Sequence, residues 1–217
     1  ALTTADGTLI ATIKDAENRQ LINTIAFDTI GAAVDIEVMP DINGNGAPEL
    51  AALGAGSTVA EIRDSLTAEV LGTVDFDTTL SPIDLELVDD QSADGVSEFA
   101  MLGQGSVKVE VKDAVNRDLI SALSFNGNYV PKDLSVWSRG ESVRVGVLAE
   151  SKDPTRGDKV EIRDLATGQV VNHLWVGKPW NLLQMELVAD LNGNSSPEAV
   201  ILREHLDDDR VSVLPVD

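Results

Sequence analysis

The sequence is poor in the side chains that most enzymes use for catalysis. It has no cysteine and only two histidines. The lack of cysteine excludes disulfides, zinc-thiolate sites and cysteine nucleophiles. His173 and His205 alone support neither a histidine cluster nor a clear nucleophilic triad, and no G-x-S-x-G motif or phosphate-binding glycine loop occurs. We therefore expect a protein that is not an enzyme.

Basic residues are scarce as well. The chain has 16 Lys and Arg residues against 37 Asp and Glu, a net charge of -21. Such an acidic chain repels nucleic acid and anionic membrane surfaces, and no apolar run approaches the roughly 20 residues of a membrane-spanning helix. We expect neither a nucleic-acid partner nor membrane insertion. The charge suits cation binding, and it equally suits the solvation of exposed strand faces.

A repeat is the strongest signal that is present. Four short alternating apolar segments (ATIKD, AEIRD, VEVKD and VEIRD) end, at spacings of 49, 49 and 51 residues, in Asp15, Asp64, Asp113 and Asp164. The same spacings separate Phe27, Phe76, Phe125 and Val176. Independent markers that agree on one period indicate a repeat architecture.

Each repeat predicts four antiparallel strands, because apolar residues alternate with a period of two and turn residues intervene. Four strands in a repeat of this length make a propeller blade. The sequence thus predicts an all-β fold, a β-propeller-like array of four-stranded antiparallel blades, in preference to a β-solenoid or two small sandwiches. One repeat domain, 1–217, would comprise a partial blade at 1–30, full blades at 31–79, 80–128 and 129–179, and a partial blade at 180–217.

The predicted strands do not fill a closed ring. The chain would open with two strands of a blade, at about 8–14 and 21–27, and close with three, which makes seventeen in all. Four blades need sixteen strands and five need twenty. Because an unpaired strand edge invites pairing with another chain, we expect an incomplete ring, a missing remainder or self-association. No signal peptide is recognisable, and Ala1 and Leu2 resemble the tail of a strand, so we expect a piece of a longer protein.

The recurring aspartates predict structural turns. Asp15, Asp64, Asp113 and Asp164 each begin a tight link between two strands. An aspartate there can accept hydrogen bonds from backbone N–H groups about two residues on and so stabilise the turn. Acidic residues also alternate along the first strands of the repeats, for example Asp35 and Glu37. We expect them either to line a wet central channel or to bond to the backbone of the next blade.

A distinctive acidic loop separates the first and second strands of three repeats. The loops read DINGNGAPE (41–49), DQSADGVSE (90–98) and DLNGNSSPE (190–198). Side-chain oxygens recur at loop positions one, three, five and nine: Asp41, Asn43, Asn45 and Glu49; Asp90, Ser92, Asp94 and Glu98; Asp190, Asn192, Asn194 and Glu198. Calcium takes about six to eight hard oxygen ligands, which suits this pattern better than magnesium chemistry does.

A hairpin without metal is the alternative interpretation of these loops, since Asn-Gly favours a tight turn by itself. The glutamate at position nine argues against it, because two carboxylates in one loop repel each other unless a cation or donor lies between them. The second loop carries three carboxylates and is expected to bind calcium most tightly. The remaining full repeat reads WSRGESVRV (137–145) and has no such ligand set; Arg139 stands in place of the first aspartate.

The loops resemble those of the FG-GAP or integrin-like propeller repeats, which run D-x-D/N-x-D/N-G-x-x-D/E before an apolar strand. Here the following strands begin ELAAL, EFAML and EAVIL. The resemblance implies calcium (Ca²⁺) in exterior loops, mainly for stability, in an extracellular or cell-surface protein. The chain departs from the pattern at Ser92 and Ser195 and lacks an evident phenylalanine-glycine element.

Trp175 is the one tryptophan that falls on a mostly polar face, since its repeat equivalents are Ala26, Asp75 and Ser124. With His173 and Lys178 it could stack on a sugar ring or a partner, or it could simply pack within a longer blade.

From the repeat, the loops and their resemblance, we expect a calcium-stabilised, non-enzymatic interaction or adhesion module with a protein or glycan partner. The alternatives are a carbohydrate-binding, lectin-type propeller and the remnant of a polysaccharide-degrading propeller enzyme.

Overall fold

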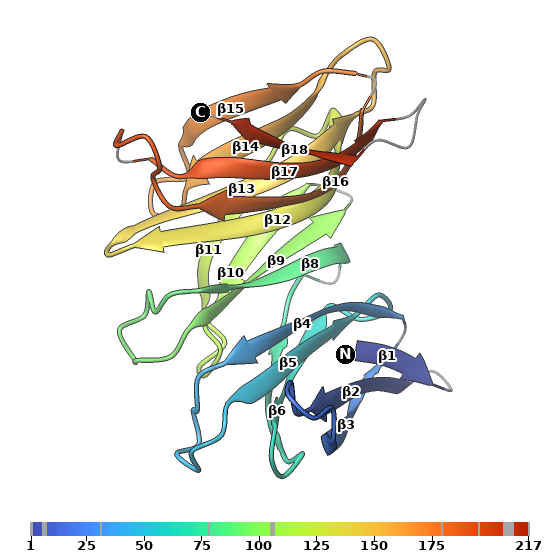
Figure 1. Cartoon of the computed structure of the whole chain (residues 1–217). Coiled ribbons are helices and arrows are strands. Elements are labelled where there is room, and N and C mark those ends of the chain that lie inside the picture. The colour runs from blue at the N-terminus through green and yellow to red at the C-terminus, as the bar shows by residue number, and fades with distance from the viewer. Residues whose placement is uncertain are drawn as a thin grey trace. The chain divides into compact units, whose positions relative to one another are not determined.

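The computed structural model describes residues 2–5, 8–30, 32–77, 79–104, 107–178, 180–194, 196–205 and 211–216, with side chains at all of these except 2–5, 29–30 and 211–216. The described residues form 18 strands and no helix (Figure 1). Accordingly, within these ranges no helix has the length and apolar character needed to cross a membrane.

The strands form five antiparallel sheets in which each strand pairs with its sequence neighbours. Three sheets have four strands: β4 (Ala33–Met39), β5 (Glu49–Gly54), β6 (Val59–Asp64) and β7 (Val70–Asp75); β8 (Ser81–Val88), β9 (Glu98–Gln104), β10 (Lys108–Lys112) and β11 (Leu119–Ser124); β12 (Tyr129–Arg139), β13 (Ser142–Ser151), β14 (Asp158–Asp164) and β15 (Val170–Val176). Two have three strands: β1 (Leu2–Ala5), β2 (Thr8–Lys14) and β3 (Leu21–Ile30); β16 (Trp180–Val188), β17 (Glu198–His205) and β18 (Val211–Val216). The predicted all-β array of antiparallel blades is therefore confirmed.

The predicted total of seventeen strands is wrong by one. β1 pairs with β2 in a tight antiparallel register, with Ala5 opposite Thr8, so the first sheet has three strands rather than two. Only four residues long and carrying two threonines, β1 offers too short an alternation for a period of two to be recognised in the sequence.

The chain divides into two compact units, Ala1–Met101 with Glu110–Ile120 and Leu102–Val109 with Ser121–Asp217. The second strands of the first two full blades are deeply buried. In β5 every residue is buried, and so are the first six of β9. Their nearly continuous apolar runs fit strands that are covered on both faces. In the first unit, Leu53, Phe99 and Met101 share one core cluster, which anchors the acidic loops at the strand ends.

The acidic residues of the first strands bond to the next blade. In the first unit, the Asp35 carboxylate on β4 accepts the backbone N–H of Leu85 on β8 at 3.3 Å. In the second unit, Asp133 on β12 accepts the N–H of Met185 on β16 at 2.5 Å. These contacts support the second of the two expectations for these acids, a bond to neighbouring backbone.

A second cross-blade contact comes from the third strands. The Glu61 carboxylate on β6 accepts the N–H of Asp28 at 2.8 Å, and Glu110 on β10 accepts the N–H of Asp77 at 2.9 Å. Asp28 and Asp77 each follow the repeated phenylalanine of the preceding blade. Two residues after each glutamate, a basic side chain lies near that phenylalanine ring, Arg63 about 5.8 Å and Lys112 about 6.0 Å from the ring centre. We call this arrangement the Glu-x-basic contact.

Candidate cation-binding loops

The four recurring aspartates do stabilise turns. The first carboxylate oxygen of Asp15 accepts the N–H groups of Glu17 and Asn18, at 2.8 and 2.9 Å. Asp64, Asp113 and Asp164 each use one oxygen in the same way, toward backbone N–H groups two or three residues on. The structural role predicted for these residues is confirmed, and for Asp64 and Asp113 it leaves the second oxygen available for other contacts.

The three acidic loops share a left-handed residue at position four, and the first two loops have another at position six. At position four the φ angles are 79° at Gly44, 65° at Ala93 and 83° at Gly193, and at position six they are 88° at both Gly46 and Gly95. Glycine reaches this left-handed region without steric cost, which accounts for its use at these two positions.

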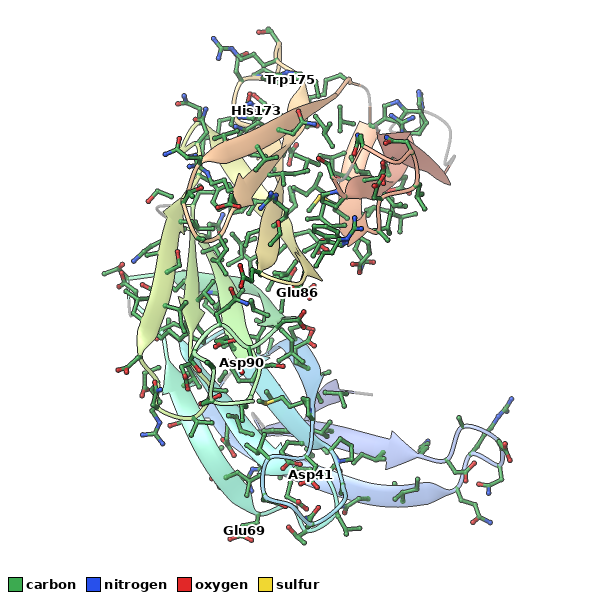
Figure 2. The ribbon with its side chains drawn as sticks, turned by 90° about the vertical axis from the view of Figure 1, so that its left-hand side faces the viewer. Asp41, Glu69, Glu86, Asp90, His173 and Trp175 are labelled. Carbon is green, nitrogen blue, oxygen red and sulfur yellow. The ribbon has the colours of Figure 1, made fainter. Side chains whose placement is uncertain are left out.

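The aspartate at position one is held by the loop backbone. Asp41 accepts the N–H of Gly44 and of Gly46, both at 2.7 Å, and Asp90 accepts those of Ala93 and Gly95 at 2.6 and 2.8 Å. The N–H of Gly95, followed by those of Ala93 and Ser92, lowers the pKa of Asp90 despite its desolvation. Asp90 is therefore ionised at neutral pH. Figure 2 shows Asp41 and Asp90 on their loops.

The glutamate at position nine is buried, unlike the exposed loop before it. Glu49 and Glu98 are both fully buried, and Glu198 is 7% exposed. One oxygen of Glu49 and of Glu98 accepts the backbone N–H groups of loop positions two and three, those of Gln91 and Ser92 to Glu98 at 2.8 and 2.9 Å. One oxygen of Glu198 accepts the N–H of Leu191, at position two. The other oxygen of each glutamate has no hydrogen-bond partner among the described residues.

Burial raises the pKa of Glu98, and the nearby charge of Asp90 adds to that effect against the hydrogen bonds from Gln91 and Ser92. A buried carboxylate oxygen that lacks a donor costs free energy, about 1–3 kcal/mol or more for a charged group. A cation bound in the loop would supply the missing partner. Within the described ranges, however, no three Asp, Glu or His side chains are already gathered as a metal site, so calcium would also need the neutral oxygens at positions three and five.

The predicted ligand-binding residues lie in the second unit. His173 and Trp175 stand beside each other on β15 (Figure 2), and Trp175 is 63% exposed. His173 lies 3.5 Å from the Glu161 carboxylate. The Lys178 ammonium is bound to the buried carboxylate of Asp158 at 3.0 and 3.1 Å. The structure thus brings His173 and Trp175 together on one exposed strand, whereas Lys178 neutralises a different group.

A hollow of about 690 Å³ lies in the first unit and is lined mostly by apolar side chains, among them Ile13, Ile36 and Leu50. The polar side chains in its lining are Thr12, Lys14 and Ser65.

No family model matches the chain, and no curated protein matches its sequence. Solved structures do match its fold. Hydrazine synthase of Kuenenia stuttgartiensis aligns with a TM-score of 0.63 and 14% identity over 97% of this chain and 60% of the other, and the WD40 domain of Toxoplasma gondii coronin with 0.63 and 14% over 100% and 56%. A structure of BBS1N in complex with ARL6DN, soaked with lead, gives 0.50 and 12% over 96% and 75%. This chain therefore spans 60% and 56% of the length of the first two, and the likeness places its fold among propeller-like blade arrays.

Proposed function

We propose that this chain is a calcium-stabilised, non-enzymatic propeller module for interaction or adhesion, part of a larger secreted or cell-surface protein. The propeller-like fold supports an interaction module, while function itself must be argued from the site. The resemblance of the loops to FG-GAP repeats supports calcium and an extracellular location. The partner is a protein or a glycan.

One observation carries the calcium assignment: the second oxygen of Glu49, Glu98 and Glu198 is buried without a hydrogen-bond partner among the described residues. Because the same unpartnered oxygen recurs in three separate loops, it is a feature of the loop type rather than an irregularity of one loop. A hairpin that only needed to turn would not require a buried carboxylate, because backbone bonds to the first aspartate already close each loop. An ion at the centre of the loop would satisfy the glutamate and the aspartate together.

Thermal unfolding with calcium and with a chelator tests this proposal. An ion that binds only the folded state raises the midpoint, by about 2.7 kcal/mol of stability at 100 times the dissociation constant. For a chain of this size we expect a rise of roughly 5–10 °C. Magnesium at the same concentration is the control and should act less. An unchanged midpoint in calcium would contradict the assignment.

A lectin-type function is the second candidate, and the exposure of Trp175 beside His173 favours it. An aromatic ring presented on an exposed strand can stack on the apolar face of a sugar. A glycan array with the parent protein and Trp175→Ala separates the candidates: saturable binding that the substitution abolishes supports the lectin, and equal signals from both proteins refute it.

A further inference from the structure

The second carboxylate oxygen, Oδ2, of the turn aspartates meets a different environment in each full blade. Asp64, Asp113 and Asp164 stand at equivalent positions, at or just after the end of the third strand. Their Oδ1 atoms all serve the turn. In the first full blade, Asp64 is the cross-strand partner of the loop glutamate Glu49, so its Oδ2 faces the acidic loop.

In the first full blade the loop itself supplies donors to this oxygen. The side-chain amides of Asn43 (2.8 Å) and Asn45 both donate to Asp64 Oδ2. The orientation of these amides is set by their own oxygens, which accept the backbone N–H of Asn45 and of Ala47, at 3.0 and 2.8 Å. The N–H of Thr67 and these two amides hold the pKa of Asp64 far below its usual range despite desolvation.

In the third full blade, which has no acidic loop, a guanidinium replaces the amides. Arg144 on β13 forms an ion pair with Asp164 Oδ2. Together with hydrogen bonds from Thr167, which are the larger cause, this pair lowers the pKa of Asp164. The second oxygen of the turn aspartate is thus satisfied in two ways, by a pair of amides in the first full blade and by a positive charge in the third.

The second full blade has neither solution. Asp113 is 1% exposed and Glu98 fully buried, and Asp113 Oδ2 and Glu98 Oε2 have no hydrogen-bond partner in the described part of the chain. Ser92 links the acidic groups: its N–H donates to Glu98 at 2.9 Å, its hydroxyl lies 3.4 Å from Asp90, and its side chain also lies against Asp113. Ser92 thus lies next to three acidic residues, and two of these, Glu98 and Asp113, each keep one buried oxygen without a hydrogen-bond partner in the described ranges.

We propose that Asp113 is a ligand of a calcium-type divalent cation held by the second loop, and that this is the strongest of the chain's cation sites. The proposal deepens the calcium function proposed above and rests on it. The oxygen set is Asp90, Ser92, Asp94, Glu98 and Asp113, hard ligands of the kind that calcium prefers. In the first loop, by contrast, calcium must first displace the Asn43 and Asn45 amides from Asp64, which weakens binding there.

Calcium titration calorimetry on the full chain tests the proposal with a matched pair of variants. Asp113→Asn keeps a side-chain oxygen for the turn but loses the second charged oxygen, and it should weaken the tightest calcium site at least tenfold. Asp64→Asn makes the same change in the first full blade and should leave that site unchanged. Equal calcium affinity in Asp113→Asn and the parent would overturn the proposal, as would equal losses in both variants.

A second pair protects the test against misfolding. Glu98→Gln retains an oxygen that can accept the Gln91 and Ser92 N–H groups, and it should remove the calcium-induced rise in midpoint, whereas Glu49→Gln should leave most of that rise. If Glu49→Gln removes the rise and Glu98→Gln does not, the first loop is the stronger site and the proposal is wrong. A parent protein that binds no calcium at all would remove the calcium function as well, which distinguishes the two failures.

Discussion

Glu161 is a buried carboxylate whose negative charge is offset by two adjacent basic side chains. Its side chain is 4% exposed and is flanked by Lys159 at 2.5 Å and Arg163 at 2.6 Å. Burial by itself raises the pKa of Glu161, but the hydrogen bonds and charges of these two residues outweigh it, so the pKa is lowered in the folded state. A carboxyl group with a lowered folded pKa stabilises the protein above its unfolded pKa and loses that contribution as the pH falls through the folded value.

We therefore expect Glu161→Gln to lower the melting midpoint at pH 7, because Lys159 and Arg163 lose their partner. The difference between variant and parent should shrink as the pH falls below about 4.5, because the glutamate is protonated first in the unfolded chain and, at lower pH, in the folded protein as well. Melting curves between pH 3 and 7 measure this. A difference that stays constant over that range would show that packing, rather than charge, accounts for the effect.

At this same scale the sequence was only partly informative. The alternation of oxygen-bearing residues made the candidate ligands of the loops recognisable, because their spacing is local. The second role of Asp64 was not recognisable, because it bonds to a loop about twenty residues earlier, which a strand pairing brings beside it. One signal was present: the repeat that lacks an acidic loop carries Arg144, which is paired with the equivalent Asp164.

The strands could be predicted from the sequence where the apolar pattern was long enough to recognise. Buried second strands such as β5 are recognisable in the sequence as apolar runs that follow a glutamate. The short β1 could not be recognised, since its pairing with β2 rests on backbone hydrogen bonds that place little demand on side chains. The same limit applies to the packing between strands of different blades, which no local pattern encodes.

Gly146 on β13 illustrates such packing between elements of the second unit. A Cβ atom at this position would lie 3.1 Å from the side chains of both Leu187 and Met185 on β16. A large side chain there must force these residues apart, and overpacking of this kind costs about 1–3 kcal/mol. We expect Gly146→Leu to lower the midpoint of urea unfolding accordingly. Leu187→Ala in the same chain should recover part of the loss, and no recovery would argue against direct contact as the cause.

For the molecule as a whole, the net charge of -21 is the dominant electrostatic fact. Like charges repel more strongly in the compact state than in the expanded one, so the charge opposes folding at low salt. We expect potassium chloride between 10 and 500 mM to raise the melting midpoint, because the screening length falls from about 30 Å to a few ångströms over that range. A midpoint independent of salt would refute this.

The salt effect also defines a control for calcium. Screening by a monovalent salt acts on all 37 acidic residues together, whereas a bound calcium ion acts at one loop and at far lower concentration. Calcium titrations are therefore best made in a constant high background of potassium chloride. Sedimentation in the same buffers measures self-association through unpaired strand edges, which stays a prediction for this chain.

The Glu-x-basic contact bears on how such a chain can change its length. Glu61 reaches the residue after Phe27, and Glu110 reaches the residue after Phe76, so each buried carboxylate depends on a partner 33 residues upstream, in the preceding blade. Removing or duplicating 49 residues, the interval between Phe27 and Phe76, presents every such glutamate with an equivalent amide, whatever the point at which the chain is joined. A deletion that removed only one partner of such a pair would leave the buried glutamate without its amide. Gain or loss of a whole period thus keeps such pairs intact.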